Sequence, residues 1–431
     1  MSLPKGFMLG SATAAHQVEG NNIHSDDWAM EHMKYTTFAE PSGDACDHYN
    51  RYEDDIRMLA QAGLNAYRFS IEWARIEPEK GQFDEKEIEH YRSVIRCCKE
   101  NGVTPIVTMM HFTSPVWLIR EGGWEAESTI EYFRRYCVYV AEKLGDEMEY
   151  VVTINEANMG LQVGELIKRF MKQMMAAKAA AQQNGNTQES NVQVGLNLDA
   201  MMERQKLAAA ENMEIFGTPT PKGFTTGLSE EGDRLVMRAH EAARDAMKEK
   251  CPHLKIGVSL SVHDIQAVPG GEENAAHAWD EEFSHYVPYI RNDDFFGLQN
   301  YTRARYDAEG VMAAPEGAEL TQMDYEYYPE ALEHVIRRVH AELPIDIIVT
   351  ENGIGTPDDE RRCAFIRTAL DGVQNCLADG IPVRGYMHWS LMDNFEWQKG
   401  FSMTFGLVAV DRSTQKRTPK PSLALLGSYA P

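Results

Sequence analysis

The segment Ile345-Asp346-Ile347-Ile348-Val349-Thr350-Glu351-Asn352 contains the pattern on which the fold depends. Its first half is a short run rich in β-branched apolar residues, which is typical of a strand that is buried on both faces. Its second half becomes polar, and residues 360–377, which have the apolar periodicity of an amphipathic helix, follow soon after. The segment therefore predicts one strand–loop–helix unit with polar side chains where the strand ends.

The same unit recurs along the whole chain. We expect strands at eight places: residues 7–10, 64–69, 103–109, 150–154, 255–260, 295–298, 345–349 and 384–388. Amphipathic helices are expected at residues 52–62, 87–98, 129–144, 230–247, 329–341 and 360–377. With no linker-like tract between the units, this predicts a single closed (β/α)8 TIM barrel, of the α/β class, over residues 1–431. An open doubly wound sheet is the alternative, but no glycine-rich phosphate turn follows the first strand.

One connection is much longer than the others. About 100 residues separate the fourth and fifth strands, and we interpret residues 160–228 as an insertion. It contains apolar residues at helical spacing and then the polar stretch 182–191. The favoured interpretation is a helix packed on the core and a surface loop; the alternative is that the insertion shapes a substrate cleft. The apolar residues are Val163, Leu166, Ile167, Phe170, Met171, Met174 and Met175.

Composition limits the classes of partner. With 42 Lys and Arg against 66 Asp and Glu, the formal net charge is −24, which argues against nucleic acid or an anionic membrane as a partner. A hydrophobic content of 43% is ordinary for a protein with a large core and excludes intrinsic disorder. The sequence contains no run of about 18 consecutive apolar residues, which is the length that a membrane-spanning helix needs. Because residues 1–7 also lack the features of a signal peptide, we expect the protein to be cytoplasmic.

Metal and disulfide chemistry find little support in the sequence. The seven cysteines are odd in number and scattered, so we interpret them as reduced thiols that lie mostly in the core. The string 240–244, HEAAR, lacks the second histidine of a zinc motif, which disfavours a metal-dependent barrel hydrolase. We expect no metal and no cofactor. A homo-oligomer is compatible with the sequence, which does not decide the oligomeric state.

Two glutamates follow strands of the predicted barrel wall. Glu156 and Glu351 lie just past apolar runs, where a carboxylate normally costs stability unless it is paired or used. Cleavage of a glycosidic bond needs such a pair, one carboxyl group protonated and one ionised. The alternative is a pair of buried, salt-bridged glutamates in a barrel of another function. Other residues of the predicted barrel accompany the two glutamates. Their side chains can donate to sugar hydroxyls or offer an indole to the apolar face of a sugar: Gln17, His111, Asn155, Trp389 and Trp397.

Six short motifs, spread in order over nearly the whole chain, carry a resemblance to a known family. They are Gly10–Gly20, Asn65–Trp73, Thr153–Glu156, Gly297–Tyr301, Val349–Gly353 and Trp389–Trp397, followed by Phe405-Gly406-Leu407. In these motifs the sequence resembles glycoside hydrolase family 1, the retaining β-glucosidase type. The resemblance implies a β-glycosidase that acts on a small-molecule β-glycoside or oligosaccharide without a cofactor, by double displacement through a covalent glycosyl-enzyme.

The resemblance also implies roles for the residues of the motifs. Glu156 corresponds to the general acid/base and Glu351 to the nucleophile, with carboxyl groups about 5–5.5 Å apart in a retaining enzyme. Arg68 and Tyr301 are expected to contact Glu351 and to favour its ionised form. Asn300, from the same motif as Tyr301, is expected among the catalytic residues. The charge of Glu351 should in turn raise the pKa of Glu156.

Further positions are implied to bind the sugar. The resemblance assigns hydroxyl contacts to Gln17, His111, Asn155, Glu396 and Trp397, a stacking floor to Trp389, and a further substrate contact to Phe405. Glu396 stands where related 6-phospho-β-glycosidases generally have serine, and Met403 and Phe405 stand where their phosphate-binding residues would be. Because a carboxylate repels phosphate, we expect an unphosphorylated sugar.

Several departures from the family pattern leave the substrate partly open. Ala157, Phe112 and Thr404 stand where Pro, Trp and Arg are usual, so the aglycone side is hard to predict. β-Galactosidase, β-fucosidase or transglycosylase activity at the same site remain alternatives. A catalytically silent sugar-binding barrel is disfavoured, because such a protein would normally have lost one of the two glutamates.

Overall fold

The barrel wall is one parallel sheet. The computed structural model describes residues 3–165, 167–168 and 198–431, and its main sheet has the order β5-β4-β3-β2-β1-β12-β11-β8-β6. The strands are β1 (Met8–Ala12), β2 (Ala66–Ser70), β3 (Thr104–Met110), β4 (Tyr150–Ile154), β5 (Lys255–Gly257), β6 (Ser259–Ser261), β8 (Phe295–Gln299), β11 (Asp346–Asn352) and β12 (Val383–Trp389). β5 pairs with β4 and β6 with β8, so these two pieces form one barrel strand broken at Val258.

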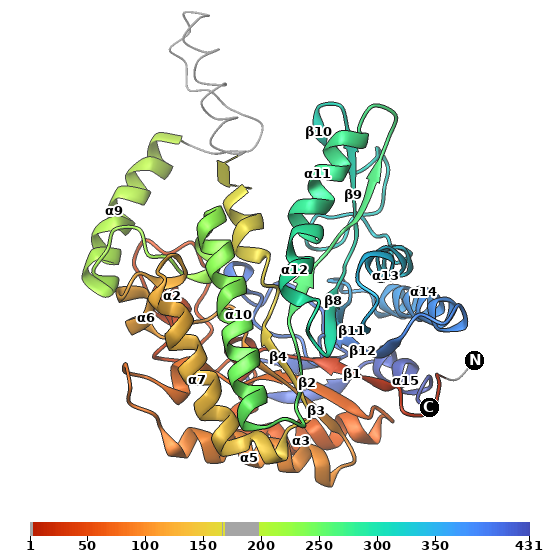
Figure 1. Ribbon diagram of the computed structural model, residues 1–431, viewed down its shortest axis with the longest axis horizontal. Helices are drawn as coiled ribbons and strands as arrows, with labels where there is room; N and C mark the ends of the chain where they lie inside the picture. Colours follow the sequence, from red (N-terminus) through yellow and green to blue (C-terminus); the bar gives the residue numbers. More distant parts are fainter. Residues whose placement is uncertain (1–2, 166, 169–197) are drawn as a thin grey trace, which may run out of the picture.

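The sheet therefore closes into the predicted eight-stranded barrel (Figure 1). All eight expected strands are present, within about three residues of the expected ends, and the fifth is divided in two. Helices surround the sheet on its outer side, and all six expected helices are among them. The helices are α1 (Ala15–Val18), α2 (Asp26–Glu31), α3 (His48–Gln61), α4 (Trp73–Ile76), α5 (Glu85–Glu100), α6 (Val116–Arg120), α7 (Ser128–Leu144), α9 (Leu198–Phe216), α10 (Glu230–Lys250), α11 (Glu272–Glu282), α12 (Val287–Ile290), α13 (Ala331–Glu342), α14 (Asp359–Ala378) and α15 (Pro421–Gly427).

The alternation of side chains along each strand divides the core into two layers. In β11, Ile347 and Val349 pack outward against the helices, whereas Ile348 packs inside the barrel. The inner cluster fills the barrel, as is usual for this fold, and ends near the cavity with Trp389 and Phe405. Other members of the inner cluster are Met8, Ala12, Ala14, Ala66, Ile106, Val152, Phe295 and Met387.

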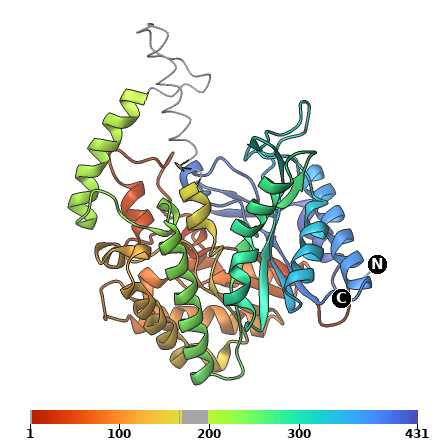
Figure 2. The same cartoon turned by 45° about the horizontal axis from the view of Figure 1, so that its top comes forward.

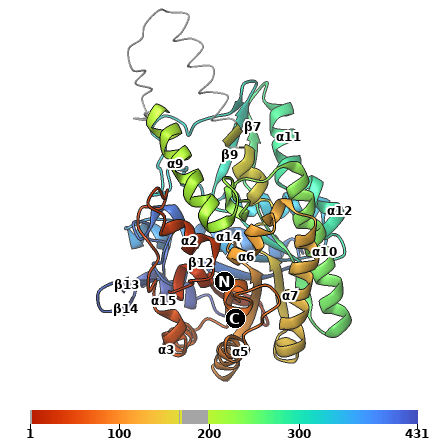
Figure 3. The same ribbon diagram turned by 90° about the vertical axis from the view of Figure 1, so that its left-hand side faces the viewer.

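Two smaller sheets lie outside the barrel wall. β7 (Asp264–Ala267), β9 (Arg303–Asp307) and β10 (Gly310–Val311) form one that projects from the barrel beside α11 (Figures 1 and 2). β13 (Val408–Asp411) and β14 (Lys416–Pro419) form an antiparallel hairpin close to α15 (Figure 3). All seven cysteines are buried free thiols, in agreement with the expectation from the sequence.

The connection between β4 and β5 includes α9, which stands apart from the barrel wall (Figure 2). Of the predicted apolar stripe, Leu166 and the residues from Phe170 onward lie outside the described residues, as does the polar stretch 182–191. Ile167 is 46% exposed, so for this residue the prediction of a core-facing position is wrong. Val163 instead lines a cavity at the strand ends, which supports the alternative that the insertion shapes a cleft.

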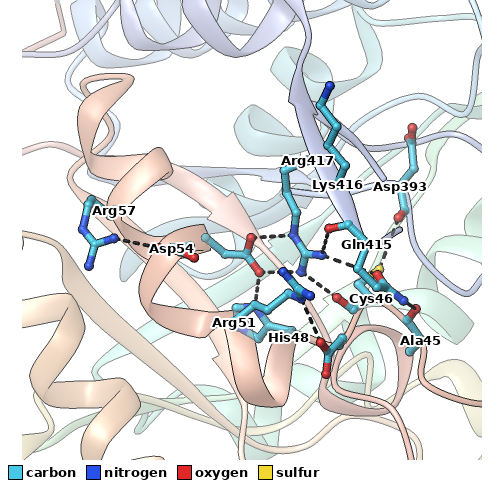
Figure 4. Close-up of polar contacts among 12 residues, drawn as sticks. Ala45, Cys46, His48, Arg51, Asp54, Arg57, Asp393, Gln415, Lys416 and Arg417 are labelled. Carbon is cyan, nitrogen blue, oxygen red and sulfur yellow. Dashed lines mark hydrogen bonds and ion pairs between the residues drawn. The ribbon is translucent and has the colours of Figure 1, made fainter. Parts of the chain in front are cut away.

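The hairpin β13–β14 is tied to α3 by a buried ion pair (Figure 4). Arg417 donates to both oxygens of Asp55, at 2.8 and 2.9 Å, and to the carbonyl oxygen of Cys46. His48 Nδ1 also lies 2.8 Å from Asp55. Burial alone would raise the pKa of Asp55, but the hydrogen bonds from His48 and Arg417 hold it below its usual value.

Replacing Arg417 with methionine is expected to cost about 3–5 kcal/mol of stability, because it leaves Asp55 buried without its main partner. The Arg57→Met variant is the matched control: Arg57 pairs with Asp54, which is 74% exposed, and should contribute at most about 1 kcal/mol. Urea unfolding of both variants and the wild type at pH 7 measures the difference. Equal midpoints for the two variants would contradict the assignment.

Candidate functional site

The carboxyl ends of the barrel strands surround a cavity of about 500 Å³. This is the end of the barrel at which enzymes of this architecture carry their active sites. Its lining includes both glutamates singled out in the sequence, Glu156 and Glu351, together with Asn155, Tyr301 and Trp389. The other sequence-predicted residues in the lining are His111, Glu396, Trp397 and Phe405.

Three donors hold the carboxylate of Glu351. Arg68 Nη1 lies 2.6 Å from Oε1, Gln299 Nε2 lies 3.0 Å from the same oxygen, and the Tyr301 hydroxyl lies 2.5 Å from Oε2. Both contacts expected for Arg68 and Tyr301 are present. All three donors favour the negative charge of Glu351, and together they fix the orientation of its carboxylate.

A β-bulge brings Glu351 into the cavity. Strict alternation from the inward Ile348 would direct Thr350 inward and Glu351 outward. The pairing of β11 with β8 shifts its register between Val349 and Glu351, and the side chain of Glu351 thereby reaches Arg68 across the barrel. Re-aiming a side chain in this way is a frequent use of bulges next to active sites.

Glu156 occupies an unusual backbone conformation at the end of β4. Its φ is 43°, in the left-handed region that residues with a Cβ rarely adopt. The turn is held by hydrogen bonds to β6: the Glu156 N–H donates to Ser259 Oγ at 3.1 Å and the Ala157 N–H to the Ser259 carbonyl oxygen at 2.8 Å. Such local strain persists only where surrounding contacts enforce it, and it is concentrated at functional sites.

The two glutamates differ in how readily they ionise. Burial raises the pKa of Glu156 well above its usual value, and the charge of Glu351 raises it further. Burial raises the pKa of Glu351 as well, and Arg68, Tyr301 and Gln299 offset only part of this increase. Because Glu351 accepts three hydrogen bonds from donors, the pair holds its shared proton on Glu156 near neutral pH.

Asn155 connects the glutamate site to His111. Its Oδ1 accepts from Arg68 Nη2 at 2.5 Å and from Gln299 Nε2 at 2.7 Å, and its Nδ2 donates to His111 Nε2 at 3.1 Å. Burial, with the nearby Arg68, lowers the pKa of His111 well below its usual value, so the ring is neutral. Since Nε2 accepts, Nδ1 carries the hydrogen; this atom is buried and has no partner among the described residues.

Glu396 and its neighbours form another part of the cavity wall. Gln17 donates to the Phe395 carbonyl oxygen at 2.7 Å and more weakly to Glu396 Oε2, at 3.4 Å. Gln17 is not part of the cavity lining and lies behind Glu396, with its buried Oε1 unpaired within the described chain. Trp397 packs parallel to the His111 ring at 6.2 Å and Trp389 does so at 5.6 Å, which gives the cavity an aromatic floor.

Asn300, which the resemblance placed among the catalytic residues, is like Gln17 absent from the cavity lining. Asn300 does not reach the cavity, because its Nδ2 donates to the carbonyl oxygens of Val262 and Thr302, at 2.8 and 3.0 Å. The preceding residue, Gln299, contacts Glu351 instead, and sequence reasoning missed it. Gln299 and Tyr301 are two residues apart and both reach Glu351, so the alternation of a strand could have identified Gln299. Other lining residues that sequence reasoning missed come from short helices, strand ends and loops at the rim: Asp27, Phe38, Met159, Gln162, Thr225, Ser261, His263, Thr302, Met323, Tyr325, Gln398 and Lys399.

Glu396 gives the protein a pH-dependent stability. Burial and the charge of Glu351 raise its pKa to about 8, against about 4.3 in an unfolded chain. Between these two values the folded state binds more protons than the unfolded state, so stability falls as pH rises through this window. The Glu396→Gln variant does not lose stability in this way. The Tm of the variant minus the Tm of wild type is therefore expected to increase from pH 5 to pH 8, by about 2–4 °C for each kcal/mol of stability that wild type loses.

The same variant should bind sugar more weakly, because a glutamine at this position cannot reproduce the hydrogen bonds of the Glu396 carboxyl group to sugar hydroxyls, each of which contributes about 0.5–1.5 kcal/mol. Thermal unfolding at both pH values, with the exposed Glu79→Gln as control, measures the stability effect. A Tm difference that does not change with pH would contradict the raised pKa of Glu396.

Within residues 3–165, 167–168 and 198–431, no group of three or more His, Cys, Asp or Glu side chains is arranged to hold a metal ion. None of the helices in that part of the chain has the length and apolar character needed to cross a membrane.

Comparison with known proteins identifies relatives over the whole chain. A family model described as "Glycosyl hydrolase family 1" matches residues 1–213 and 281–429. A 1,4-beta-D-glucan glucohydrolase of Thermotoga neapolitana is 29% identical, covering 97% of this chain and 96% of that protein. A beta-glucosidase of Agrobacterium sp. is 31% identical, covering 97% and 93%. The crystal structure of beta-glycosidase BGL167 superposes with a TM-score of 0.87 at 45% identity, covering 99% and 97% of the two chains.

Proposed function

The chain belongs to glycosyl hydrolase family 1 and is a glycosidase, and we propose that it is a retaining β-glucosidase that removes terminal, unphosphorylated β-D-glucosyl residues. The observation that carries this proposal is the contrast between the two glutamates of one cavity. Glu351 is held ionised by Arg68, Gln299 and Tyr301, whereas Glu156 retains a proton. Double displacement at a glycosidic bond needs this pair of states.

In the first step Glu351 Oε attacks the anomeric carbon while Glu156 donates its proton to the glycosidic oxygen. The bond to the leaving group breaks and a glycosyl ester of Glu351 forms. This ester carries no charge, so the pKa of Glu156 falls, and its carboxylate can accept a proton from water. Water then attacks the same carbon, and glucose leaves with its original β configuration.

Sugar recognition is assigned to the groups around the two glutamates. We assign hydroxyl contacts to Glu396, Trp397, Asn155 and neutral His111, and a stacking surface to Trp389. Gln17 acts mainly by fixing Glu396, since it lies behind that side chain. Phe405 closes the cavity beside Tyr301, with a ring separation of 6.3 Å.

Glucose is preferred here over galactose or fucose because the Thermotoga neapolitana and Agrobacterium relatives are described as a glucohydrolase and a glucosidase. A 6-phosphate is disfavoured because it would face Glu396, which offers no positive charge to a phosphate. We further propose that residues 1–431 act as one catalytic domain. The substrate is a small-molecule β-glycoside or oligosaccharide, and neither nucleic acid nor a membrane is a partner. The seven reduced cysteines favour a cytoplasmic setting, and homo-oligomerisation is left open.

The decisive experiment is hydrolysis of 4-nitrophenyl β-D-glucoside, followed by proton NMR of the released sugar. β-Glucose as the first product is expected, and α-glucose as the first product would overturn the retaining mechanism. The β-galactoside, the β-fucoside and the 6-phospho-β-glucoside are compared in parallel, and faster turnover of any of them would reassign the substrate. Transfer of glucose to added alcohol measures transglycosylation. A folded protein without turnover of any glycoside would favour the silent barrel.

A further inference from the structure

One carboxylate in the cavity wall has no part in the proposed reaction. Asp27 lies in the first turn of α2, is only 3% exposed, and lines the cavity. Within the described part of the chain its side chain accepts no hydrogen bond and forms no ion pair. Its neighbour Asp26 differs, since Asp26 Oδ1 accepts from the N–H groups of Ser114 and Asp27 at 2.8 and 3.0 Å. The side chain of Asp26 thus stabilises the local backbone through hydrogen bonds, whereas that of Asp27 makes no such contact.

The surroundings of Asp27 are predominantly negative. Burial raises the pKa of Asp27 to about 6, Glu31 and Glu72 raise it as well, and His16 lowers it. His16 also pairs with Glu31, because its Nε2 lies 3.5 Å from Glu31 Oε2. At pH 7.5 Asp27 is therefore ionised, buried, and without a full positive charge of its own.

Lys399 also lines the cavity, but its side chain is exposed on the turn after Trp397. Among the described residues it makes no ion pair with Asp27. A lysine in that position keeps its hydration and contributes little to the energy of a buried carboxylate.

Asp27 lies away from the reacting groups. The charges that set its pKa are His16, Glu31 and Glu72, and not Glu156 or Glu351. The first turn of α2 contacts the segment after β3 and packs against the loop 223–226, since a Cβ at Gly223 would lie 3.0 Å from Asp26. Helix α9 contacts the residues just after α2, because the carboxylate of Glu211 accepts hydrogen bonds from the N–H groups of Lys34 and Tyr35. Asp27 is also absent from the charges that shift the pKa values of Glu156 and Glu351. This separation from both glutamates is the reason for assigning the wall around Asp27 to the leaving-group side of the cavity.

We propose that the leaving-group half of the cavity selects aglycones that carry a positively charged amine on an apolar stem, with Asp27 as the residue that pairs with the amine. A buried carboxylate without a partner is costly, and an ammonium group of the substrate would supply both charge and hydrogen-bond donors. Phe38, Phe112 and Trp397 line the same cavity and offer apolar surface for the stem. The inference rests on the proposed glucosidase activity and names its substrate class.

The test compares two β-D-glucosides that differ in one group: 4-(aminomethyl)phenyl, which is cationic at pH 7.5, and 4-(hydroxymethyl)phenyl, which is neutral. The kcat/KM for the aminomethyl glucoside divided by the kcat/KM for the hydroxymethyl glucoside is measured for wild type and for Asp27→Asn. Any difference in leaving-group ability is the same for both enzymes, so the change in the ratio isolates Asp27. We expect the ratio to fall about tenfold in Asp27→Asn, while kcat/KM for the neutral glucoside changes less than about twofold. In 0.5 M NaCl the wild-type preference should shrink.

Asp54→Asn is the control for the change in net charge, because Asp54 is 74% exposed on α3 and remote from the cavity. Asp27→Leu is the second variant, and it should lower the ratio as much as Asp27→Asn. An unchanged ratio in Asp27→Asn, or an equal fall in Asp54→Asn, would overturn the proposal. An equal loss for both glucosides would mean that Asp27 serves a neutral hydroxyl, which would also overturn it.

A binding measurement separates this inference from the proposed function. The corresponding thioglucosides are not hydrolysed, and their Kd values can be measured by calorimetry whether or not the enzyme turns over. Tighter binding of the aminomethyl compound by wild type, lost in Asp27→Asn, supports the inference even without turnover. Turnover of both O-glucosides with no such preference would sustain the glucosidase and reject the role of Asp27.

Discussion

Replacing Glu351 with alanine is expected to lower kcat for 4-nitrophenyl β-D-glucoside by at least about 10,000-fold, because no other group in the cavity can form the glycosyl ester. The change also leaves Arg68, which is fully buried, without its carboxylate partner. A stability control is therefore needed. Glu351→Gln keeps acceptor capacity for Arg68 while removing the charge, and it should be as inactive and closer to wild type in Tm.

Added azide gives a sharper readout of the Glu351 variant. In Glu351→Ala, azide can enter the space that the carboxylate vacated and attack the anomeric carbon from that face. With Glu156 still present as the acid, the product should be α-glucosyl azide. NMR of the product identifies the anomer. Glu396→Gln, which alters another carboxylate of the same cavity, should give no glucosyl azide of this configuration. Formation of β-glucosyl azide by Glu351→Ala would contradict its role as nucleophile.

Glu156→Ala is expected to show a loss that depends on the leaving group. Proton donation contributes about 100- to 10,000-fold, but a 2,4-dinitrophenolate leaves without it. The loss in kcat/KM should therefore be large for an alkyl glucoside and small for the 2,4-dinitrophenyl glucoside. Equal losses for both substrates would contradict the role of Glu156 as acid.

The pH profile of the Glu156 variant supplies a second readout. In wild type, kcat/KM should decrease as pH rises through the raised pKa of Glu156, since only the protonated form donates. Glu156→Ala should lack this basic limb and keep the acidic limb, which reports ionisation of Glu351. Azide should now yield β-glucosyl azide, because it attacks the glycosyl-enzyme from the face of the leaving group. The two glutamate variants thus predict opposite anomers.

The architecture could be predicted from the sequence because its signals are local. A run such as Ile347–Val349 buries both faces of a parallel strand, and the polar residues that follow it mark the end of the barrel at which the site forms. For the same reason Glu156, Glu351, Arg68 and Tyr301 could be singled out. The division of the fifth strand at Val258 could not be predicted, since it depends on pairing with two different neighbours.

The chain by itself determined the barrel, its family and its pair of glutamates, because strand periodicity and short motifs are properties of neighbouring residues. Tertiary structure decided which side chains act together. The register shift between Val349 and Glu351 turns the carboxylate inward, Gln299 rather than Asn300 reaches it, and Asp27 enters the cavity wall from the first turn of α2. These outcomes depend on contacts between segments far apart in sequence, where bulges, burial and charge combine, and no local pattern records them.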